Sequence, residues 1–538
     1  MIKLMKRVLC FLIFGSFTMN TYSQTIDWVL LYENVTSGFE DIDINASSMF
    51  MAGTIRPNGQ PWAGHSVSGY GYQDGVLCKA DTAGNINWVR VAGSVSGEKA
   101  RFVRYHNNML YLAGNVINWS GNSIMRIGSS QWSIPPFPSV TNGYVVQMDT
   151  SGNVNWIHFV PSDVQSFEID AAGNAYASCS DSYRTYLYKF SSSGAQLFEK
   201  YISEKRYPCL LSTDPSGNIF LGINFSDSIV FFGNLYTGFG SSDILLSRLD
   251  VNGNPLSAVV IGGAGLDALS YIKHTANNNI LITGVWVDTV QCNNVTISGT
   301  GNRHFIAALD PNLSFVMWND REFRIPSHYI TNTPNGNSIL SDNGRYYISL
   351  NFEDTLIAGV DTLIGKRFGG YYGNGCVASF DAALNLLWYR TLAESSNPGY
   401  NTGHASVWIR PVGNRIYLSG QMMEQCIIDG ISYNPSNNYH AFTALLTDTF
   451  QMSVGISEIR DGSADDWIVY PNPARDVFTV KLGHSYLSST IQLADQTGRT
   501  LFFQKAELNL SHINMKNYPD GIYFMRINER TKKIVLMR

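Results

Sequence analysis

The stretch KADTAGNINWVRVAG, residues 79–93, decides the fold, and a close copy, QMDTSGNVNWIHFV, follows at 147–160. Each copy runs from a strand into Asp-x-x-Gly-Asn and then into a second strand that contains Trp88 or Trp156. Asp and Asn side chains bond to the backbone of a tight turn and Gly tolerates a positive φ, so each copy predicts a hairpin. Weaker copies lie at 189–202, 248–263, 307–319 and 379–391, and a degenerate copy begins at Leu445.

A second marker alternates with the first along the chain. It is a short apolar strand that ends in Gly or another small residue, and it occurs at 49–53, 109–114, 174–179, 218–223, 279–284, 345–350 and 415–420. Both markers occur seven times, which indicates four-stranded repeats of roughly sixty residues. Four-stranded antiparallel units in tandem are the pattern of a β-propeller. We therefore expect an all-β fold with a seven-bladed β-propeller at residues 24–450.

The segment IDWVLLYE, 26–33, resembles the fourth strand of a repeat but precedes any first strand. Trp28 stands in it where Trp88 stands in the first repeat. We expect this segment to complete the last blade by pairing with 441–447, because that pairing closes the ring without a free edge.

The composition supports a turn-rich β protein. The chain has 538 residues, of which 48 are Gly, 13% are aromatic and only 15% are charged. Disordered chains are instead poor in apolar residues and rich in charge. The formal net charge is -5, so nucleic acid is not an expected partner, because no basic field would hold a phosphate backbone.

Residues 1–23 have the order of features of a signal peptide. Lys3, Lys6 and Arg7 precede a short apolar run at 8–17, and small residues follow before Gln24. The run is too short to span a bilayer, although an N-terminal anchor is the alternative interpretation. No later segment approaches about 18 continuous apolar residues, so we expect no transmembrane segment in the mature chain.

The cysteines do not form a recognisable metal or redox motif. Six follow the signal segment, and none belongs to a Cys-x-x-Cys pair, which argues against a zinc knuckle or a thioredoxin-type site. Their irregular spacing favours single buried strand residues, and oxidation in an exported protein is the alternative. They are Cys78, Cys179, Cys209, Cys292, Cys376 and Cys426.

The composition changes after residue 450. Residues 451–467 include the polar, acidic run SEIRDGSADD and are predicted to be a linker. Residues 468–538 then alternate apolar and polar positions between turn residues. This pattern predicts a small Ig-like antiparallel β-sandwich.

Residues 468–538 resemble the type A C-terminal sorting domain of type IX secretion. The motif residues occur in the family order, and they are Tyr470, Pro471, Asn472, Pro473 and Ala474, the turn from Asp495 to Gly498, Gly521 with Tyr523, and Lys532 with Lys533 before an apolar end. The resemblance implies periplasmic delivery, passage across the outer membrane by the type IX secretion machinery, and a secreted or outer cell-surface location. An ordinary Ig-like binding module is the alternative.

The region before the linker, from residue 26 to about 450, is similar to bacterial β-propeller repeat proteins. The units of that family contain Asn-x-Tyr-x-x-Gly followed by Asp-x-x-Gly-Asn-x-x-Trp. The resemblance implies the fold but says little about activity, because propellers host binding and catalysis alike.

Motifs that would identify an enzyme or a cofactor site are missing from the sequence. It contains no HExxH, GxSxG elbow, P-loop or Rossmann fingerprint. Asp41-x-Asp43-x-Asn45 resembles the start of a calcium loop, but Ala46 and Thr54 occupy the places of the required Gly and Glu. Alternation along a first strand is the better interpretation, so we expect no metal and no cofactor.

First strands line the pore of a propeller, and polar residues that enter them could share a central site. The candidates are Glu40, Asp41, Glu98, Asp267 and His404. A glycosidase would need two of these carboxylates at a defined separation. A water-filled polar pore is the alternative.

The long loops after the second strands carry many aromatic residues, which suit stacking on sugars or anchoring a protein partner. The candidate ligand-binding residues are Trp62, Tyr70, Tyr72, Trp119 and Trp132. Several loops also share a pattern, as in DSIVFFG at 227–233, DTVQCNN at 288–294 and DTLIAGV at 354–360. That pattern predicts a recurring structural hairpin whose aromatics pack on the blade below, which is the competing interpretation.

These features favour an exported propeller that is not an enzyme and that binds a glycan or a protein. The alternative is a secreted polysaccharide hydrolase or lyase with a site on the pore face. A purely structural extracellular component is the third hypothesis.

Overall fold

The computed structural model describes residues 23–537 except 34–35, 119–122, 138, 182, 294, 325–337, 341–343, 353–354, 359–360, 365–373, 392–404, 423–425, 429–430, 434–439, 450–466, 471, 473, 483–489, 496–499, 506–509 and 528–529. Apart from Ser23, the predicted signal peptide lies outside the described residues, and so does the predicted linker apart from Trp467. The contacts divide the chain into two compact units, one covering Tyr22–Phe450 and one that includes Gln451–Arg538. No helix among the described residues is long and apolar enough to cross a membrane.

The first unit consists of sets of four antiparallel strands, and each set is formed by successive parts of the chain except the one that contains β1. In chain order the sets are β2 (Thr36–Ile44), β3 (Ser48–Arg56), β4 (Asp74–Asp81) and β5 (Ile86–Gly93); β6 (Glu98–His106), β7 (Met109–Ile117), β10 (Thr141–Asp149) and β11 (Val154–Val160); β12 (Val164–Ile169), β13 (Ala175–Ser180), β14 (Thr185–Phe190) and β15 (Gln196–Ser203); β16 (Cys209–Thr213), β17 (Ile219–Phe225), β20 (Asp243–Leu249) and β21 (Pro255–Gly262); β22 (Ala268–His274), β23 (Ile280–Cys292), β24 (Val295–Leu309) and β25 (Phe315–Arg324); β26 (Ser338–Leu340), β27 (Tyr346–Phe352), β30 (Asn374–Phe380) and β31 (Leu386–Thr391); and β32 (Ala405–Val412), β33 (Arg415–Met422), β36 (His440–Thr449) and β1 (Ser23–Tyr32).

The Asp-x-x-Gly-Asn turns close these strands through one recurring set of hydrogen bonds. Asp81 Oδ1 accepts from the N–H groups of Ala83 and Asn85 at 3.0 and 2.9 Å, and Asn85 Nδ2 donates to Asp81 Oδ2 at 2.9 Å. Gly84 has a φ of 89°, which residues with a Cβ rarely adopt. The turn of Asp149 repeats the bonds, so the turn chemistry read in the sequence is what joins the strands.

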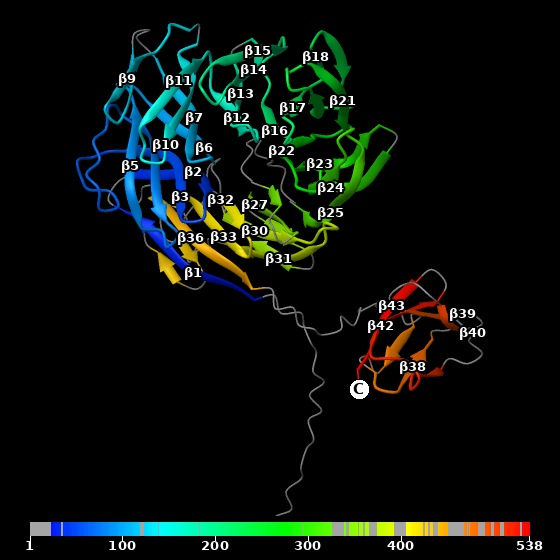
Figure 1. The fold of residues 1–538 in the computed structure, drawn as a ribbon. Coiled ribbons are helices and arrows are strands. Elements are labelled where there is room, and N and C mark those ends of the chain that lie inside the picture. The colour runs from blue at the N-terminus through cyan, green and yellow to red at the C-terminus, as the bar shows by residue number, and fades with distance from the viewer. Residues whose placement is uncertain are drawn as a thin grey trace, which may run out of the picture. The chain divides into compact units, whose positions relative to one another are not determined.

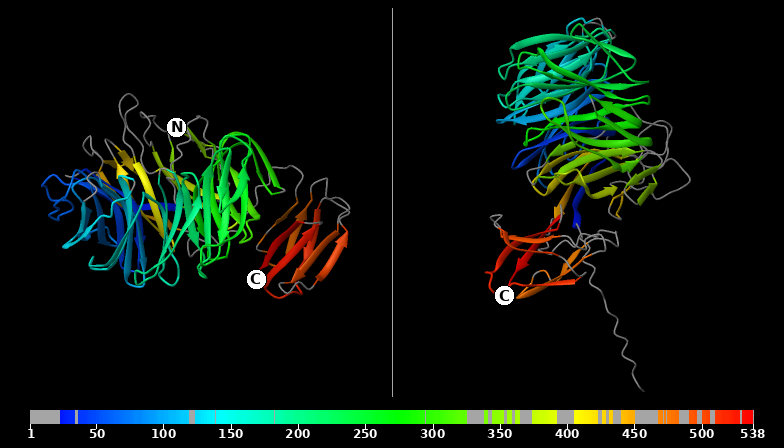
Figure 2. Two further views of the ribbon diagram at one scale, coloured as in Figure 1. Left: turned by 90° about the horizontal axis from the view of Figure 1, so that it is seen from above. Right: turned by 90° about the vertical axis from the view of Figure 1, so that its right-hand side faces the viewer.

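The apolar cores lie between neighbouring sets. One buried cluster joins Phe50 and Leu77 of the first set to Leu112 and Val146 of the second, and another joins the first set to the last. Sets that bury each other's faces around a common centre form a β-propeller-like fold. Figure 1 shows this arrangement of the sheets, and Figure 2 shows the strands from two further sides.

The ring is closed by the N-terminal strand. β1 pairs with β36 in antiparallel register from Ser23 opposite Thr449 to Tyr32 opposite Ala441, which confirms the expected pairing of 26–33 with 441–447. Figure 1 shows β1 beside β36. Tyr32 also donates a hydrogen bond from its hydroxyl to the Gly84 carbonyl at 2.8 Å. The closing strand is therefore bonded to both the last and the first set.

Hairpins in the loops between second and third strands reach over to the preceding set. β8 (Ile124–Ile127) pairs with β5 and β18 (Ser228–Phe231) pairs with β15. β28 (Thr355–Ala358) pairs with β25, and the far end of β23 pairs with β21. The second strands of the hairpins include β9 (Ser130–Ser133), β19 (Asn234–Thr237) and β29 (Asp361–Ile364), and β34 (Cys426–Ile428) pairs with β35 (Ile431–Tyr433). The recurring hairpin predicted from 227–233, 288–294 and 354–360 is confirmed, and such hairpins cover part of the outer strands β5, β15, β21 and β25.

The described cysteines fit the interpretation of single buried strand residues. Cys78, Cys179, Cys209, Cys292 and Cys376 are buried and unpaired, and each lies in a strand. The side chain of Cys426 is outside the described residues.

The second unit contains two antiparallel sheets. One is β37 (Ile468–Tyr470), β38 (Val477–Lys481) and β41 (Leu510–Asn514), and the other is β40 (Thr500–Lys505), β39 (Thr490–Asp495), β42 (Gly521–Ile527) and β43 (Arg530–Leu536). Phe478 and Val480 of the first sheet share one buried cluster with Leu493 and Met525 of the second. Alternate residues along β42 are buried and exposed, as a sheet with one face on a core requires.

Candidate functional site

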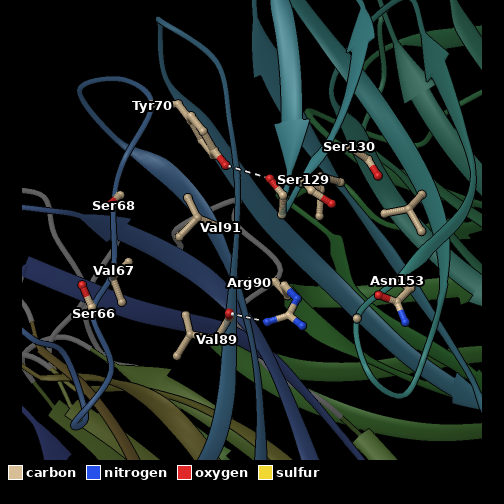
Figure 3. A pocket seen from close by; sticks show the side chains of 14 residues that line it. Ser66, Val67, Ser68, Tyr70, Val89, Arg90, Val91, Ser129, Ser130 and Asn153 are labelled. Atoms are coloured by element: carbon tan, nitrogen blue, oxygen red, sulfur yellow. Dashed lines mark hydrogen bonds between the residues drawn. The ribbon is translucent and has the colours of Figure 1, made fainter.

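A polar pocket of about 410 Å³ lies between the first two sets of strands. It is lined by 66–68 and Tyr70 from the loop after β3, by 89–91 of β5, by 127–130 at the β8–β9 turn and by 152–154 at the β10–β11 turn. Figure 3 shows these segments around it. Pockets of a few hundred Å³ are typical of sites for small ligands.

Two hydrogen bonds connect the walls of the pocket. The Tyr70 hydroxyl donates to the Gly128 carbonyl at 3.1 Å, which ties the loop to the hairpin that belongs to the neighbouring repeat. Arg90 Nη2 donates to the Ser151 carbonyl at 2.8 Å, which ties β5 to the β10–β11 turn. The pocket is therefore formed by the contact between two repeats.

The lining combines hydroxyl and amide groups with one aromatic ring, one cation and five aliphatic side chains. Ser66, Ser68, Ser129, Ser130 and Asn153 supply donors and acceptors, and no carboxylate is among the lining residues. Such a lining can bind a ligand rich in hydroxyl groups, but it offers no acid and base pair for hydrolysis.

The predicted aromatic residues divide into surface and core positions. Tyr70 lines the pocket, and Tyr72 is 74% exposed beside it in sequence, with the Arg56 guanidinium 4.7 Å from its ring centre. Trp119 lies outside the described residues.

The two remaining tryptophans pack against other side chains. Trp62 has 0% of its surface exposed and lies 5.9 Å from Tyr32 and 6.0 Å from Phe39, ring centre to ring centre. Its loop crosses to the closing strand, so the ring presents no surface to a ligand. Trp132 is half-buried on β9 against the core that contains Met125. Trp132 thus lies on a hairpin strand, whereas Trp62 lies in the β3–β4 loop, and both rings pack against buried clusters.

The first strands of several sets carry a network of ion pairs. First strands of neighbouring sets contact one another around the ring. Arg104 pairs with Asp41 and lies 3.5 Å from Glu168, whose Oε1 accepts from Lys273 Nζ at 2.7 Å. Arg410 pairs with Asp43 at 2.9 Å. Three carboxylates thus face three cations, and only Asp41 of these six was among the pore candidates.

The other pore candidates have separate surroundings. Glu40 lies 3.6 Å from both Lys99 Nζ and Arg101 Nε. Glu98 accepts from the Ser94 N–H at 2.8 Å, and Asp267 accepts from the Gly263 N–H at 2.6 Å. These two carboxyls are buried without exposed surface, and burial raises the pKa of each to about 7. His404 lies outside the described residues.

Asp41 and Asp43 hold adjacent repeats together and do not form one ligand set. Asp41 Oδ2 accepts from the Val103 N–H at 3.0 Å, and Asp43 Oδ2 accepts from the Tyr105 N–H at 2.8 Å. Among the described residues, no group of three or more His, Cys, Asp or Glu side chains is arranged to hold a metal ion. Asp41 and Asp43, two positions apart on β2, thus both contact the neighbouring strand β6.

In the second unit, Asn472 holds the last strand. Its Nδ2 donates to the Lys533 carbonyl at 2.7 Å, and its Oδ1 accepts from the Val535 N–H at 2.8 Å. The Ala474 N–H donates to the Val535 carbonyl at 2.8 Å. The motif that opens the domain is thus bonded to the motif that ends it.

The remaining described motif residues lie in the strands and the core of the same unit. Tyr470 ends β37, and Lys532 Nζ lies 4.8 Å from the Trp467 ring centre and donates to the Trp467 carbonyl. Gly521 begins β42, and the Tyr523 ring is buried in the core. Pro471, Pro473 and Gly498 lie outside the described residues.

Comparison with solved structures gives distant likenesses. The quinohemoprotein alcohol dehydrogenase of Comamonas testosteroni is 8% identical, with a TM-score of 0.36 over 85% of this chain and 80% of that chain. The polysaccharide lyase Uly1 is 9% identical, with a TM-score of 0.39 over 76% and 90%. PorZ of Porphyromonas gingivalis, a surface component of the type IX secretion system, is 11% identical, with a TM-score of 0.17 over 95% and 100%. Likenesses at this level carry no information on activity.

The search of curated proteins gives no match. Residues 468–537 match the family model described as "Secretion system C-terminal sorting domain". This match covers the two sheets and the Asn472 contact described above. The chain therefore carries a type IX C-terminal sorting domain and is a secreted or outer-surface protein.

Proposed function

We propose that the protein is a seven-bladed β-propeller that binds a glycan outside the cell and has no catalytic role. Residues 1–23 would direct it to the periplasm, and 468–538 would then engage the secretion machinery. The blade number rests on the two sequence markers, each present seven times. The strand sets of four and the closing pair β1–β36 support the same number.

The polar pocket beside Tyr70 carries the proposal of glycan binding. Its serines, Asn153 and Tyr70 present hydroxyl and amide groups at the contact of two repeats. Sugars combine hydroxyl groups with an apolar ring face, so a polar lining with one aromatic ring complements them.

A hydrolase or lyase acting at the pore face is less well supported. Asp41, Asp43 and Glu168 each lie within ion-pairing distance of a cation. Asp41 and Asp43 also accept hydrogen bonds from backbone N–H groups of β6, so their oxygens are already engaged within the fold. Glu98 and Asp267, whose pKa values suit proton transfer better, have no exposed surface.

A glycan array probed with the purified mature chain tests the proposal. Ser129→Trp should fill the pocket and abolish binding, because Ser129 lies at its exposed β8–β9 turn. Tyr183→Ala is the matched control, since Tyr183 is an exposed aromatic of another repeat. Unchanged binding by Ser129→Trp, or release of reducing sugar by the wild-type chain, would contradict the proposal.

A further inference from the structure

Three arginines lie in or beside the pocket. Arg90 lines the pocket, the Arg126 guanidinium lies 5.7 Å from the Tyr70 ring centre, and Arg56 lies over Tyr72. No ion pair involves any of these three within the part of the chain that the structure describes, whereas Arg104 and Arg303 are paired with carboxylates. The chain has a net charge of -5, so this positive patch does not follow from the overall composition.

The acids that are closest in sequence to the pocket are already engaged. Asp74 is buried, and its Oδ2 accepts from the Tyr70 N–H at 3.0 Å. Both carboxylate oxygens of Asp149 accept hydrogen bonds from backbone N–H and side-chain amide groups of its own turn. Neither side chain lines the pocket, so neither neutralises Arg90 by direct contact.

Arg90 retains donors for a ligand. Nη1 donates to the Val89 carbonyl at 3.2 Å and Nη2 to the Ser151 carbonyl at 2.8 Å, so two of the five N–H groups of the guanidinium are used. The Trp88 ring, 5.1 Å from the guanidinium carbon, helps to hold it in place. Figure 3 shows Arg90 and Asn153 at one part of the pocket and Tyr70 and Ser129 at another.

We infer that the pocket selects an acidic saccharide, with its carboxylate or sulfate at Arg90, its hydroxyl groups at the serines and Asn153, and Arg126 adding positive charge at the rim. Guanidinium donors bind such anions strongly because the hydrogen bonds are charge-assisted. This inference rests on the proposed glycan binding and specifies the class of glycan.

The test uses an array of matched pairs: oligogalacturonides against their methyl esters, and sulfated oligosaccharides against their desulfated forms. The mature wild-type chain should bind at least one acidic member about tenfold or more tightly than its neutral partner. Arg90→Gln and Arg126→Gln should each remove most of this preference, and added salt should weaken it. Arg184→Gln is the matched control, because Arg184 lies over the Tyr201 ring in another repeat.

The possible outcomes separate the two claims. Equal binding of acidic and neutral partners would overturn the inference and leave glycan binding intact. An absence of binding across the array would overturn both. Inorganic sulfate is the last probe. If it stabilises the chain as much as the best oligosaccharide does, the pocket binds anions in general, and the inference that it selects an acidic saccharide is refuted. If Arg90→Gln alters the far-ultraviolet circular dichroism, the acidic preference of Arg126→Gln is used to judge the inference instead. Within the described residues, the Arg126 side chain contacts the Tyr70 ring and makes no hydrogen bond, so this change should leave the fold intact.

Discussion

Replacement of Tyr32 by Phe tests how the ring is closed. Tyr32 ends the closing strand β1 and has 7% of its surface exposed. Its hydroxyl donates to the Gly84 carbonyl at 2.8 Å and lies 2.7 Å from Thr443 Oγ1. A single oxygen therefore bonds β1 to the first set and to β36 of the last.

The expected cost follows from these two contacts. The phenyl ring of Phe keeps the packing, so no cavity forms, but the Gly84 carbonyl and the Thr443 hydroxyl each lose a buried partner. Burial raises the pKa of Tyr32 above its ordinary value, so the hydroxyl remains a donor throughout the working pH range. Leaving a buried polar group without its partner costs about 1–3 kcal/mol, and we expect Tyr32→Phe to destabilise the first unit by that amount.

Urea-induced unfolding of the mature chain, followed by tryptophan fluorescence, measures the effect. If unfolding is irreversible, the unfolding rate at a fixed urea concentration replaces the equilibrium value and should rise about tenfold. Tyr72→Phe is the control, because Tyr72 is exposed and a surface change of this kind is usually within about 0.5 kcal/mol.

A double variant sharpens the test. Thr443→Val combined with Tyr32→Phe should cost less than the sum of the single changes, since the two hydroxyls share one contact. The reasoning is refuted if Tyr32→Phe unfolds like Tyr72→Phe, or if the two changes at 32 and 443 are strictly additive.

Three further predictions follow from other parts of the chain. Deletion of 468–538 should leave a folded propeller in the periplasm, checked by cell fractionation, and normal delivery of this truncated form to the surface or medium would contradict the assigned sorting role. Asn472→Ala should lower the unfolding free energy of the sorting domain by about 1–3 kcal/mol, because two hydrogen bonds to β43 are lost. The measurement is the urea midpoint of that domain, and an unchanged midpoint would show that the contact is dispensable. Burial raises the pKa of Glu98 to about 7 from 4.5, so between these pH values the folded chain keeps a proton that the unfolded chain releases. The resulting stabilisation is full below about pH 4.5 and is lost as the pH rises through 7. Glu98→Gln should therefore reduce the fall in unfolding free energy between pH 4.5 and 7, and an unchanged pH dependence would contradict the role of Glu98.

Features that depend on a few neighbouring residues could be predicted from the sequence alone. The Asp-x-x-Gly-Asn turns form where the pattern placed them, because their hydrogen bonds join residues two to four positions apart. Alternation then indicated the strands, and the misplaced Trp28 segment indicated the closing pair. The sorting motif could also be recognised in the sequence, because all of its residues lie within residues 468–537.

Features that join side chains from different repeats were decided only by the tertiary structure. The aromatic pattern did not distinguish Trp62, which is buried against the closing strand, from Tyr72, which is exposed. Neither the pairing of Lys273 with Glu168, 105 positions apart, nor the pocket formed by four segments leaves a local signal in the sequence. Turn chemistry and alternation act over a few residues, whereas burial and charge pairing depend on which surfaces the closed ring brings together.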